Sequence, residues 1–165
     1  MMLNINRNEL QTLYRYCYSL VNNKNEADDL LQSGLEKWLK LDQQKDYSLA
    51  YIRKIIRNQF IDQCRRKKRV PFEQFDETTP LIMSSESMEQ ALIDDQEVEL
   101  LMDKLNAGER ETLFLWAVME YSASEIASET GEPRGTILSR LYRIKSKINS
   151  ENNQTKISIS AGGEK

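Results

Sequence analysis

Hydrophobic residues recur at helical spacing along most of the chain, and this period predicts an all-α protein. Three amphipathic segments come first, at about residues 8–22, 26–41 and 48–68, and short polar stretches separate them. The positions expected to face inward are Leu10, Leu13, Tyr14, Cys17, Leu20 and Val21 in the first segment, Ala27, Leu30, Leu31, Leu35, Trp38 and Leu39 in the second, and Tyr51, Ile52, Ile55, Ile56, Phe60 and Ile61 in the third.

The period is lost over residues 70–88, which contain two prolines and several serines and threonines. This composition is typical of a linker. Helical spacing resumes over residues 88–105 and 109–119, where Leu113, Phe114, Trp116, Ala117 and Val118 are candidates for the core. We therefore expect two small helical domains, at 1–69 and 89–148, joined by a flexible linker at 70–88 and followed by a polar tail at 149–165 that frays.

Residues 122–148 carry the signals of a helix-turn-helix. Ser122 and Glu125 have the spacing of a capping box, which begins a short helix. Gly131 suits the left-handed residue that ends it, and Pro133 suits the first turn of the next helix. The alternative is an ordinary helical hairpin within a bundle, which needs neither this turn nor a basic face.

Charge is segregated along the chain, although its net value is only -3. Residues 53–69 are strongly basic with Asp62 as their single acid, residues 73–111 are strongly acidic, and residues 134–147 carry five basic residues and no acid. Two basic blocks separated by an acidic one suggest two surfaces for a polyanion and a connector that does not bind it. The alternative for each block is a solvated helix face.

The chemistry of both basic helices fits DNA. Arginine and hydroxyl side chains of the last helix suit a major groove. In the third helix, the amides of Asn58 and Gln59 and the rings of Tyr51 and Phe60 suit unpaired bases. Helical spacing favours a plain core role for both rings, Asn58 is alternatively a structural amide, and the basic run after Cys64 is alternatively a solubilising helix end.

Composition argues against several other classes. The chain has no histidine, and its two cysteines, Cys17 and Cys64, lack metal-ligand spacing, so we expect no metal, no cofactor and no enzyme. Cys17 lies on an apolar stripe and is interpreted as a buried hydrophobe. Neither a membrane-spanning run nor a signal peptide is present, which predicts a cytoplasmic protein without membrane insertion.

Three segments together resemble the extracytoplasmic-function (ECF) group of bacterial sigma factors. "EADDLLQSGLEKWLK" is similar to the region 2 helix that docks on RNA polymerase, and "YIRKIIRNQFIDQCRRKKR" to the region 2 helix that recognises the -10 element. "LNAGERETLFLWAVMEYSASEIASETGEPRGTILSRLYRIKSKI" is similar to region 4, which reads the -35 element. Ser33 and Gly34 replace an acid-threonine pair that is common in the family, and Leu138 stands where the family often has Lys or Arg.

The resemblance implies a factor that binds the RNA polymerase core and promoter DNA and is controlled by an anti-sigma factor. The implied polymerase contacts are Asp29, Leu31 and Gln32. The expected -10 contacts are Lys54, Arg57, Asn58 and Asp62, extended by Arg65 and Arg66, and the expected -35 contacts are Arg134, Thr136, Ser139, Arg140 and Arg143.

Two other functions remain open on the sequence. A stand-alone helix-turn-helix regulator explains the last two helices but leaves the basic third helix unused. A nuclease needs a carboxylate cluster for Mg²⁺ beside a basic face, and the only candidates, Glu26, Asp28 and Asp29, fit a helix start better.

Overall fold

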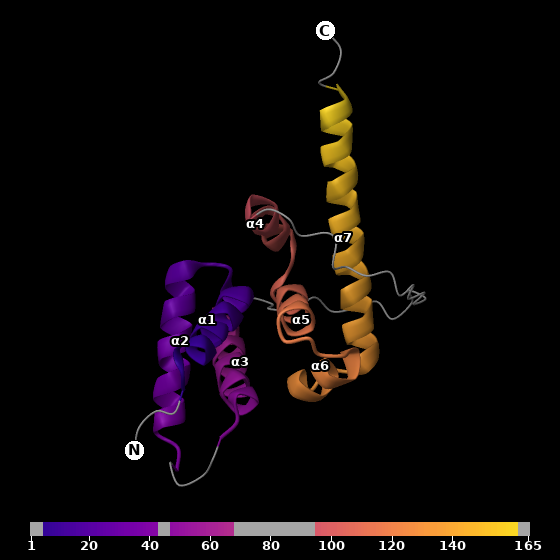
Figure 1. The fold of residues 1–165 in the computed structure, drawn as a ribbon. Helices are drawn as coiled ribbons and strands as arrows, with labels where there is room; N and C mark the ends of the chain where they lie inside the picture. Colours follow the sequence, from indigo (N-terminus) through magenta and orange to yellow (C-terminus); the bar gives the residue numbers. More distant parts are fainter. Residues whose placement is uncertain (1–4, 43–46, 68–94, 162–165) are drawn as a thin grey trace.

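The computed structural model describes residues 5–42, 47–67 and 95–161, with side chains of the last range over 98–150. The described residues form seven α-helices and no strand, in agreement with the all-α prediction (Figure 1). The expected linker at 70–88 lies outside the described residues. Helices α1 to α3 form an N-terminal module, and α4 to α7 form a C-terminal module beside it (Figure 1).

The N-terminal module is a bundle of three capped helices, α1 (Arg7–Val21), α2 (Lys24–Leu39) and α3 (Leu49–Arg66). The side chains of Asn6, Asn23 and Ser48 accept hydrogen bonds from backbone N–H groups of the first turns, which would otherwise lack partners. Asn22 ends α1 in the left-handed region at φ 52°, so that α2 can fold back along it.

The C-terminal module contains α4 (Asp95–Lys104), α5 (Ala107–Ala117), α6 (Ala123–Thr130) and α7 (Arg134–Ala161). Helix α7 is the longest, and its end projects past the other helices (Figure 1). The sequence analysis predicted a polar tail that frays after Ile148, and this was wrong for residues 149–161, because helix α7 continues to Ala161. No glycine or proline interrupts residues 149–161, so a helix stop is absent there although the sequence is polar.

The two modules share one continuous hydrophobic core. Helix α1 packs against α5 as well as against α2 and α3. The rings of Tyr16 and Phe114 lie 5.5 Å apart across this contact. Arg110 of α5 donates hydrogen bonds of 2.7 and 3.0 Å to the carbonyl oxygens of Ser19 and Leu20, which satisfies acceptors at the end of α1. The modules are therefore closed on each other.

A close approach between α2 and α3 explains the unusual Ser33-Gly34 pair. A Cβ atom added to Gly34 would lie 2.5 Å from Ile56 Cγ1, so only glycine fits there without displacing Ile56. Beside it, the Gln59 side chain donates a hydrogen bond to the Ser33 hydroxyl. The pair that departs from the family pattern thus forms a contact of its own.

Most residues predicted to face inward are buried or half-buried, with a few exceptions at the edges of the stripes. Leu10, Leu39, Tyr51 and Val118 are 41 to 48% exposed, and Ala117 is exposed as well, so their assignment to the core was wrong. Tyr51 instead stacks on Tyr47, with ring centroids 5.0 Å apart. Phe60 and Cys17 are buried, as the apolar stripes predicted.

Candidate nucleic-acid interface

Helices α6 and α7 form the predicted helix-turn-helix. Ser122 and Glu125 cap α6 reciprocally, through hydrogen bonds from Glu125 N to Ser122 Oγ and from Ser122 N to the Glu125 carboxylate. Gly131 ends α6 at φ 72°, in the left-handed region that glycine adopts at little cost. The inward stripe of α7, namely Ile137, Leu141 and Ile144, is buried as expected.

Only part of the predicted recognition set on α7 is open to solvent. Arg134 is exposed and its Nε lies 3.2 Å from Ser124 Oγ. Thr136 and Ser139 are half-buried, and the Ser139 hydroxyl donates a 2.9 Å hydrogen bond to the Gly135 carbonyl. The exposed end of this surface is therefore the first turn of α7.

Three further basic residues of α7, namely Arg140, Arg143 and Lys147, lie beside carboxylates. Arg140 is 3% exposed and is held by Glu132, with 3.0 Å between Arg140 Nη2 and Glu132 Oε1. Further along, Arg143 and Lys147 lie 3.8 and 2.8 Å from the carboxylate of Glu109, which is wholly buried. The expectation that Arg140 occupies an open face was wrong, because Glu132 before α7 folds back onto it.

On α3, most of the predicted contacts form one exposed face. Lys54, Asn58 and Asp62 recur at intervals of four residues and all are exposed, as are Arg65 and Arg66 at the helix end. Asp62 lies 4.0 Å from Arg65, an exposed ion pair that contributes little to stability. The face combines cations with an amide and leaves its aromatic neighbour Phe60 in the core.

Arg57 differs from the rest of this set because it points into the contact between the modules. Its side chain is 11% exposed. Its Nε lies 2.9 Å from Glu111 Oε1 of α5, and its Nη2 lies 3.5 Å from Glu132 Oε1. The Tyr16 hydroxyl donates a 2.6 Å hydrogen bond to the same Glu111 oxygen. Burial, together with the charge of Glu111, raises the pKa of Tyr16 well above its ordinary value, so this hydroxyl keeps its proton.

Arg53, one turn before Arg57, makes a second contact between the modules. Its Nε donates a 2.7 Å hydrogen bond to Glu129 of α6, and its Nη2 donates another of 2.7 Å to the Tyr121 hydroxyl. The guanidinium also lies 5.7 Å from the centre of the Tyr121 ring. From the sequence, Arg53 was expected only to add to the charge of the basic block at 53–69. Its position between Ile52 and Ile56 on the buried stripe was the available signal of burial.

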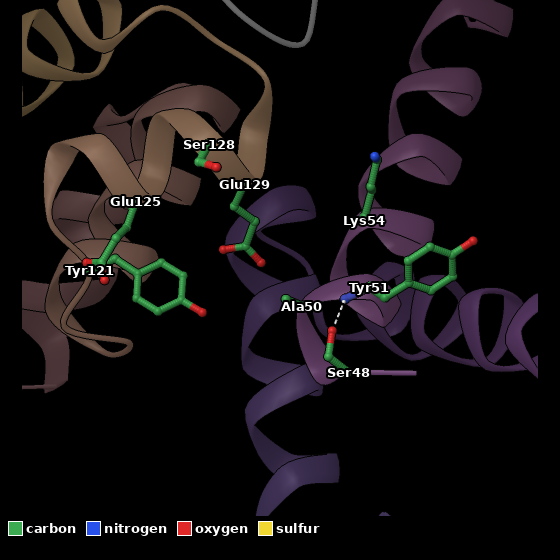
Figure 2. Close-up of a pocket in the computed structure, with 8 residues that line it drawn as sticks. All are labelled: Ser48, Ala50, Tyr51, Lys54, Tyr121, Glu125, Ser128 and Glu129. Carbon is green, nitrogen blue, oxygen red and sulfur yellow. Dashed lines mark hydrogen bonds between the residues drawn. The ribbon is translucent and has the colours of Figure 1, made fainter. Parts of the chain in front are cut away.

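A cleft of about 470 Å³ lies between the start of α3 and α6. Figure 2 shows Glu129 reaching from α6 toward α3, whereas the ring of Tyr51 points away from α6. Lys54 projects from the α3 side of the same cleft (Figure 2). The cleft therefore joins the exposed face of α3 to the acidic side of α6.

The predicted polymerase contacts lie on a different surface. Asp29 and Gln32 are exposed on α2, and Leu31 between them is half-buried. Figure 1 shows α2 on the side of the N-terminal module that faces away from α5 to α7. Contact between the modules therefore leaves this face of α2 open.

The acidic residues 73–111, which were expected to form one connector between the two modules, do not all lie in a connector. Its last members, Glu109 and Glu111, are buried in α5. Glu109 pairs with Lys147 of α7, and Glu111 pairs with Arg57 of α3. Most of the earlier acids, from Glu73 to Asp94, lie outside the described residues. The interpretation of the whole segment as a non-binding tether was wrong for its end. None of the helices within the described ranges is long and apolar enough to cross a membrane.

Comparison with known families accounts for both modules. The sequence model of Sigma-70 region 2 matches residues 7–70, and that of Sigma-70 region 4 matches residues 95–148. A curated relative, the ECF RNA polymerase sigma factor EcfG of Rhodopseudomonas palustris, is 31% identical over 140 residues, which cover 83% of this chain and 77% of the relative. The chain belongs to the ECF sigma factors. It binds the RNA polymerase core and directs initiation of transcription at promoters.

Two further similarities support this assignment. The sigma factor is 24% identical over 143 residues to ECF RNA polymerase sigma factor SigE of Mycolicibacterium smegmatis, covering 83% of this chain and 56% of SigE. It is also similar to the structure of the sigma factor RpoE in complex with the anti-sigma factor NepR from Bartonella quintana, with a TM-score of 0.61 and 25% identity over 86% of this chain and 90% of that one. The likeness extends across both modules of the sigma factor.

Proposed function

We propose that the sigma factor divides its work among three surfaces. Asp29, Leu31 and Gln32 of α2 contact the polymerase core. The face of α3 grips the unpaired -10 strand through Lys54, Asn58, Asp62, Arg65 and Arg66, joined by Arg57. The first turns of α7 read the -35 duplex through Arg134, Thr136 and Ser139, joined by Arg140 and Arg143.

The observation that carries this proposal is a second exposed basic face, on α3, in addition to the helix-turn-helix. A factor that only bound duplex DNA would need the helix-turn-helix alone. Here a second basic face carries an amide beside its cations, a combination suited to unpaired bases. Two weak DNA contacts on one chain act together through effective concentration once the polymerase holds them in place.

Run-off transcription with purified core polymerase on a promoter library tests the proposal. Asp29→Ala should reduce core binding and transcription, whereas Asp28→Ala removes the same charge one position earlier on an exposed side chain and should not. Lys54→Ala should weaken binding to all promoters alike, while Arg134→Ala should change which -35 sequences are selected if it contacts bases. Equal losses in Asp29→Ala and Asp28→Ala would contradict the assigned polymerase face.

We also propose an anti-sigma factor as a partner and the cytoplasm as the site of action. The partner is supported by the likeness to RpoE, whose structure was solved with the anti-sigma factor NepR. Titrating a candidate anti-sigma factor into the run-off reaction should abolish transcription, and adding excess sigma factor should restore it. In this scheme the sigma factor supplies specificity, and the polymerase supplies the catalysis.

A further inference from the structure

The outward side of α7 carries an uncharged strip through its first turns. Helix α7 packs mainly on α5 and α6, and its inward stripe is buried there. Gly135, Ser139, Tyr142 and Ser146 follow one another at intervals of four, three and four residues, so they share one side of the helix. Three of them are exposed and Ser139 is half-buried, which places this strip on the solvent side.

Tyr142 and Leu138 form the apolar part of the strip. Tyr142 is 43% exposed, and its hydroxyl makes no hydrogen bond to a described residue. Leu138 is half-buried and stands four residues earlier, a spacing at which two side chains on a helix surface are neighbours. Beside them, the Ser139 hydroxyl already donates its proton to the Gly135 carbonyl. The strip therefore offers a ligand apolar surface rather than free donors.

The arginines of α7 lie at the borders of this strip or turn away from it. Arg134 is exposed in the first turn, Arg143 lies 3.8 Å from the buried carboxylate of Glu109, and Arg140 is only 3% exposed. Residues 134–147 contain no acid. Cations at the borders suit the phosphates that line a DNA groove, and the uncharged strip between them is left for the base edges.

One base suits such a strip. In the major groove thymine alone presents a methyl group, which apolar side chains contact and charged side chains do not recognise. An arginine at position 138 would instead favour guanine or a phosphate. Leu138, which stands where related sigma factors often have Lys or Arg, removes that option and adds apolar surface next to Tyr142.

We propose that Leu138 and Tyr142 contact the methyl group of a thymine in the major groove of the -35 element and so determine part of the promoter specificity. This inference rests on the proposed -35 contact of α7 and names a base for it. It adds a preference that the arginines of α7 do not supply.

Replacement of thymine by deoxyuridine tests the contact, because it removes the methyl group and keeps every hydrogen-bonding group of the base. Run-off transcription with core polymerase on the promoter library should first select a thymine, on one strand or the other, in the -35 element. Deoxyuridine is then placed at each selected thymine in turn. At one position the affinity of the complex of polymerase and wild-type sigma factor should fall about fourfold, the value of one buried methyl group.

The ratio of affinities for thymine and deoxyuridine is then measured in four variants. Leu138→Ala and Tyr142→Ala should each lose most of the wild-type difference, whereas Tyr142→Phe keeps the ring and should retain it. Ser146→Ala is the matched control, since it changes an exposed side chain on the same strip one turn further along. A general loss of stability or of phosphate binding affects both DNAs alike and leaves the ratio unchanged.

The outcomes separate this inference from the proposed function. Equal affinities for thymine and deoxyuridine at every position, or a selected -35 element without thymine, overturn the methyl contact and leave the function intact. An undiminished difference in Leu138→Ala and Tyr142→Ala overturns it as well, because the methyl group is then contacted by other residues. Failure of the wild-type chain to support transcription with core polymerase overturns the proposed function together with this inference.

Discussion

The Tyr16 hydroxyl donates a 2.6 Å hydrogen bond to Oε1 of Glu111, joining α1 to α5 across the contact between the modules. Both side chains are buried, and the same oxygen accepts from Arg57 Nε at 2.9 Å. A buried carboxylate needs several donors, because each lost donor leaves desolvated charge behind. Removal of the hydrogen bond between Tyr16 and Glu111 should therefore weaken the contact between the modules.

Replacement of Tyr16 by phenylalanine removes this donor and keeps the ring against Phe114. We expect the free energy of unfolding to fall by about 1.5–3 kcal/mol, the usual range for a hydrogen bond to a charged group. Tyr14→Phe on the same helix is the matched control, since its hydroxyl makes no hydrogen bond to a described residue. Urea unfolding of both variants checks this, and equal losses would show that the bond contributes nothing.

The free energy of unfolding should depend on pH through the ionisation of Glu111. Burial, with a smaller contribution from the charge of Glu132, raises its pKa above the ordinary 4.5, although Arg57 and the Tyr16 hydroxyl oppose the shift. The folded state therefore keeps this proton to higher pH than the unfolded state. The contribution of Glu111 to stability falls as pH rises from the ordinary value to the raised one, and it is constant above that.

Urea midpoints measured across this pH window in the wild type and in Glu111→Gln show whether the contribution of Glu111 to stability falls or rises with pH. The difference in stability, wild type minus variant, should decrease with rising pH. Glu125→Gln is a control of opposite sign, because hydrogen bonds from the backbone and side chain of Ser122 lower the pKa of Glu125. The contribution of Glu125 to the free energy of unfolding should be lost as pH falls. A difference for Glu111→Gln that increases with pH would contradict a raised pKa.

The contact of Gly34 with Ile56 predicts that a substitution favoured by helix propensity is harmful here. Alanine in place of glycine gains about 1 kcal/mol of helix propensity. A Cβ atom 2.5 Å from Ile56 Cγ1 introduces overpacking that costs about 1–3 kcal/mol. Gly34→Ala should therefore lower stability when Ile56 is present and raise it in an Ile56→Ala background, where Cγ1 is gone. A double-mutant cycle by chemical denaturation measures this coupling, and a stabilising Gly34→Ala in the wild-type background would contradict it.

Local signals in the sequence were sufficient for the helices and for the helix-turn-helix. The capping pair Ser122 and Glu125, the stop at Gly131 and the stripe of Ile137 and Ile144 all lie within one short segment, where periodicity and capping chemistry determine the outcome. The buried stripe of Ile52, Ile56 and Phe60 in α3 followed in the same way from helical spacing, whereas the contacts on its exposed face were implied by the family resemblance. Leu10 failed as a core prediction because it lies at the edge of its stripe, where the width of the partner helix decides burial.

The contact between the modules was not predictable from local pattern. Arg53 and Glu129 are far apart in the chain, and both look like solvated charges when each helix is considered alone. The burial of Arg140 depends on Glu132 folding back across the turn, which helix periodicity does not encode. Segregated charge pointed to a polyanion partner, but the chain's own carboxylates satisfy part of that positive charge in the closed state.

Two glycines of the helix-turn-helix should respond to alanine in opposite ways. Gly131 has φ 72°, and a side chain there is strained even though nothing lies within 4 Å of the added Cβ. The left-handed conformation costs a non-glycine residue about 1–2 kcal/mol, so Gly131→Ala should lower the free energy of unfolding by that amount. Gly135 lies in α7 with open space around its Cβ position, and Gly135→Ala should raise stability by about 0.4–1 kcal/mol. Thermal unfolding of the two variants decides the point. Equal shifts in the same direction would contradict the difference in backbone conformation between the two positions.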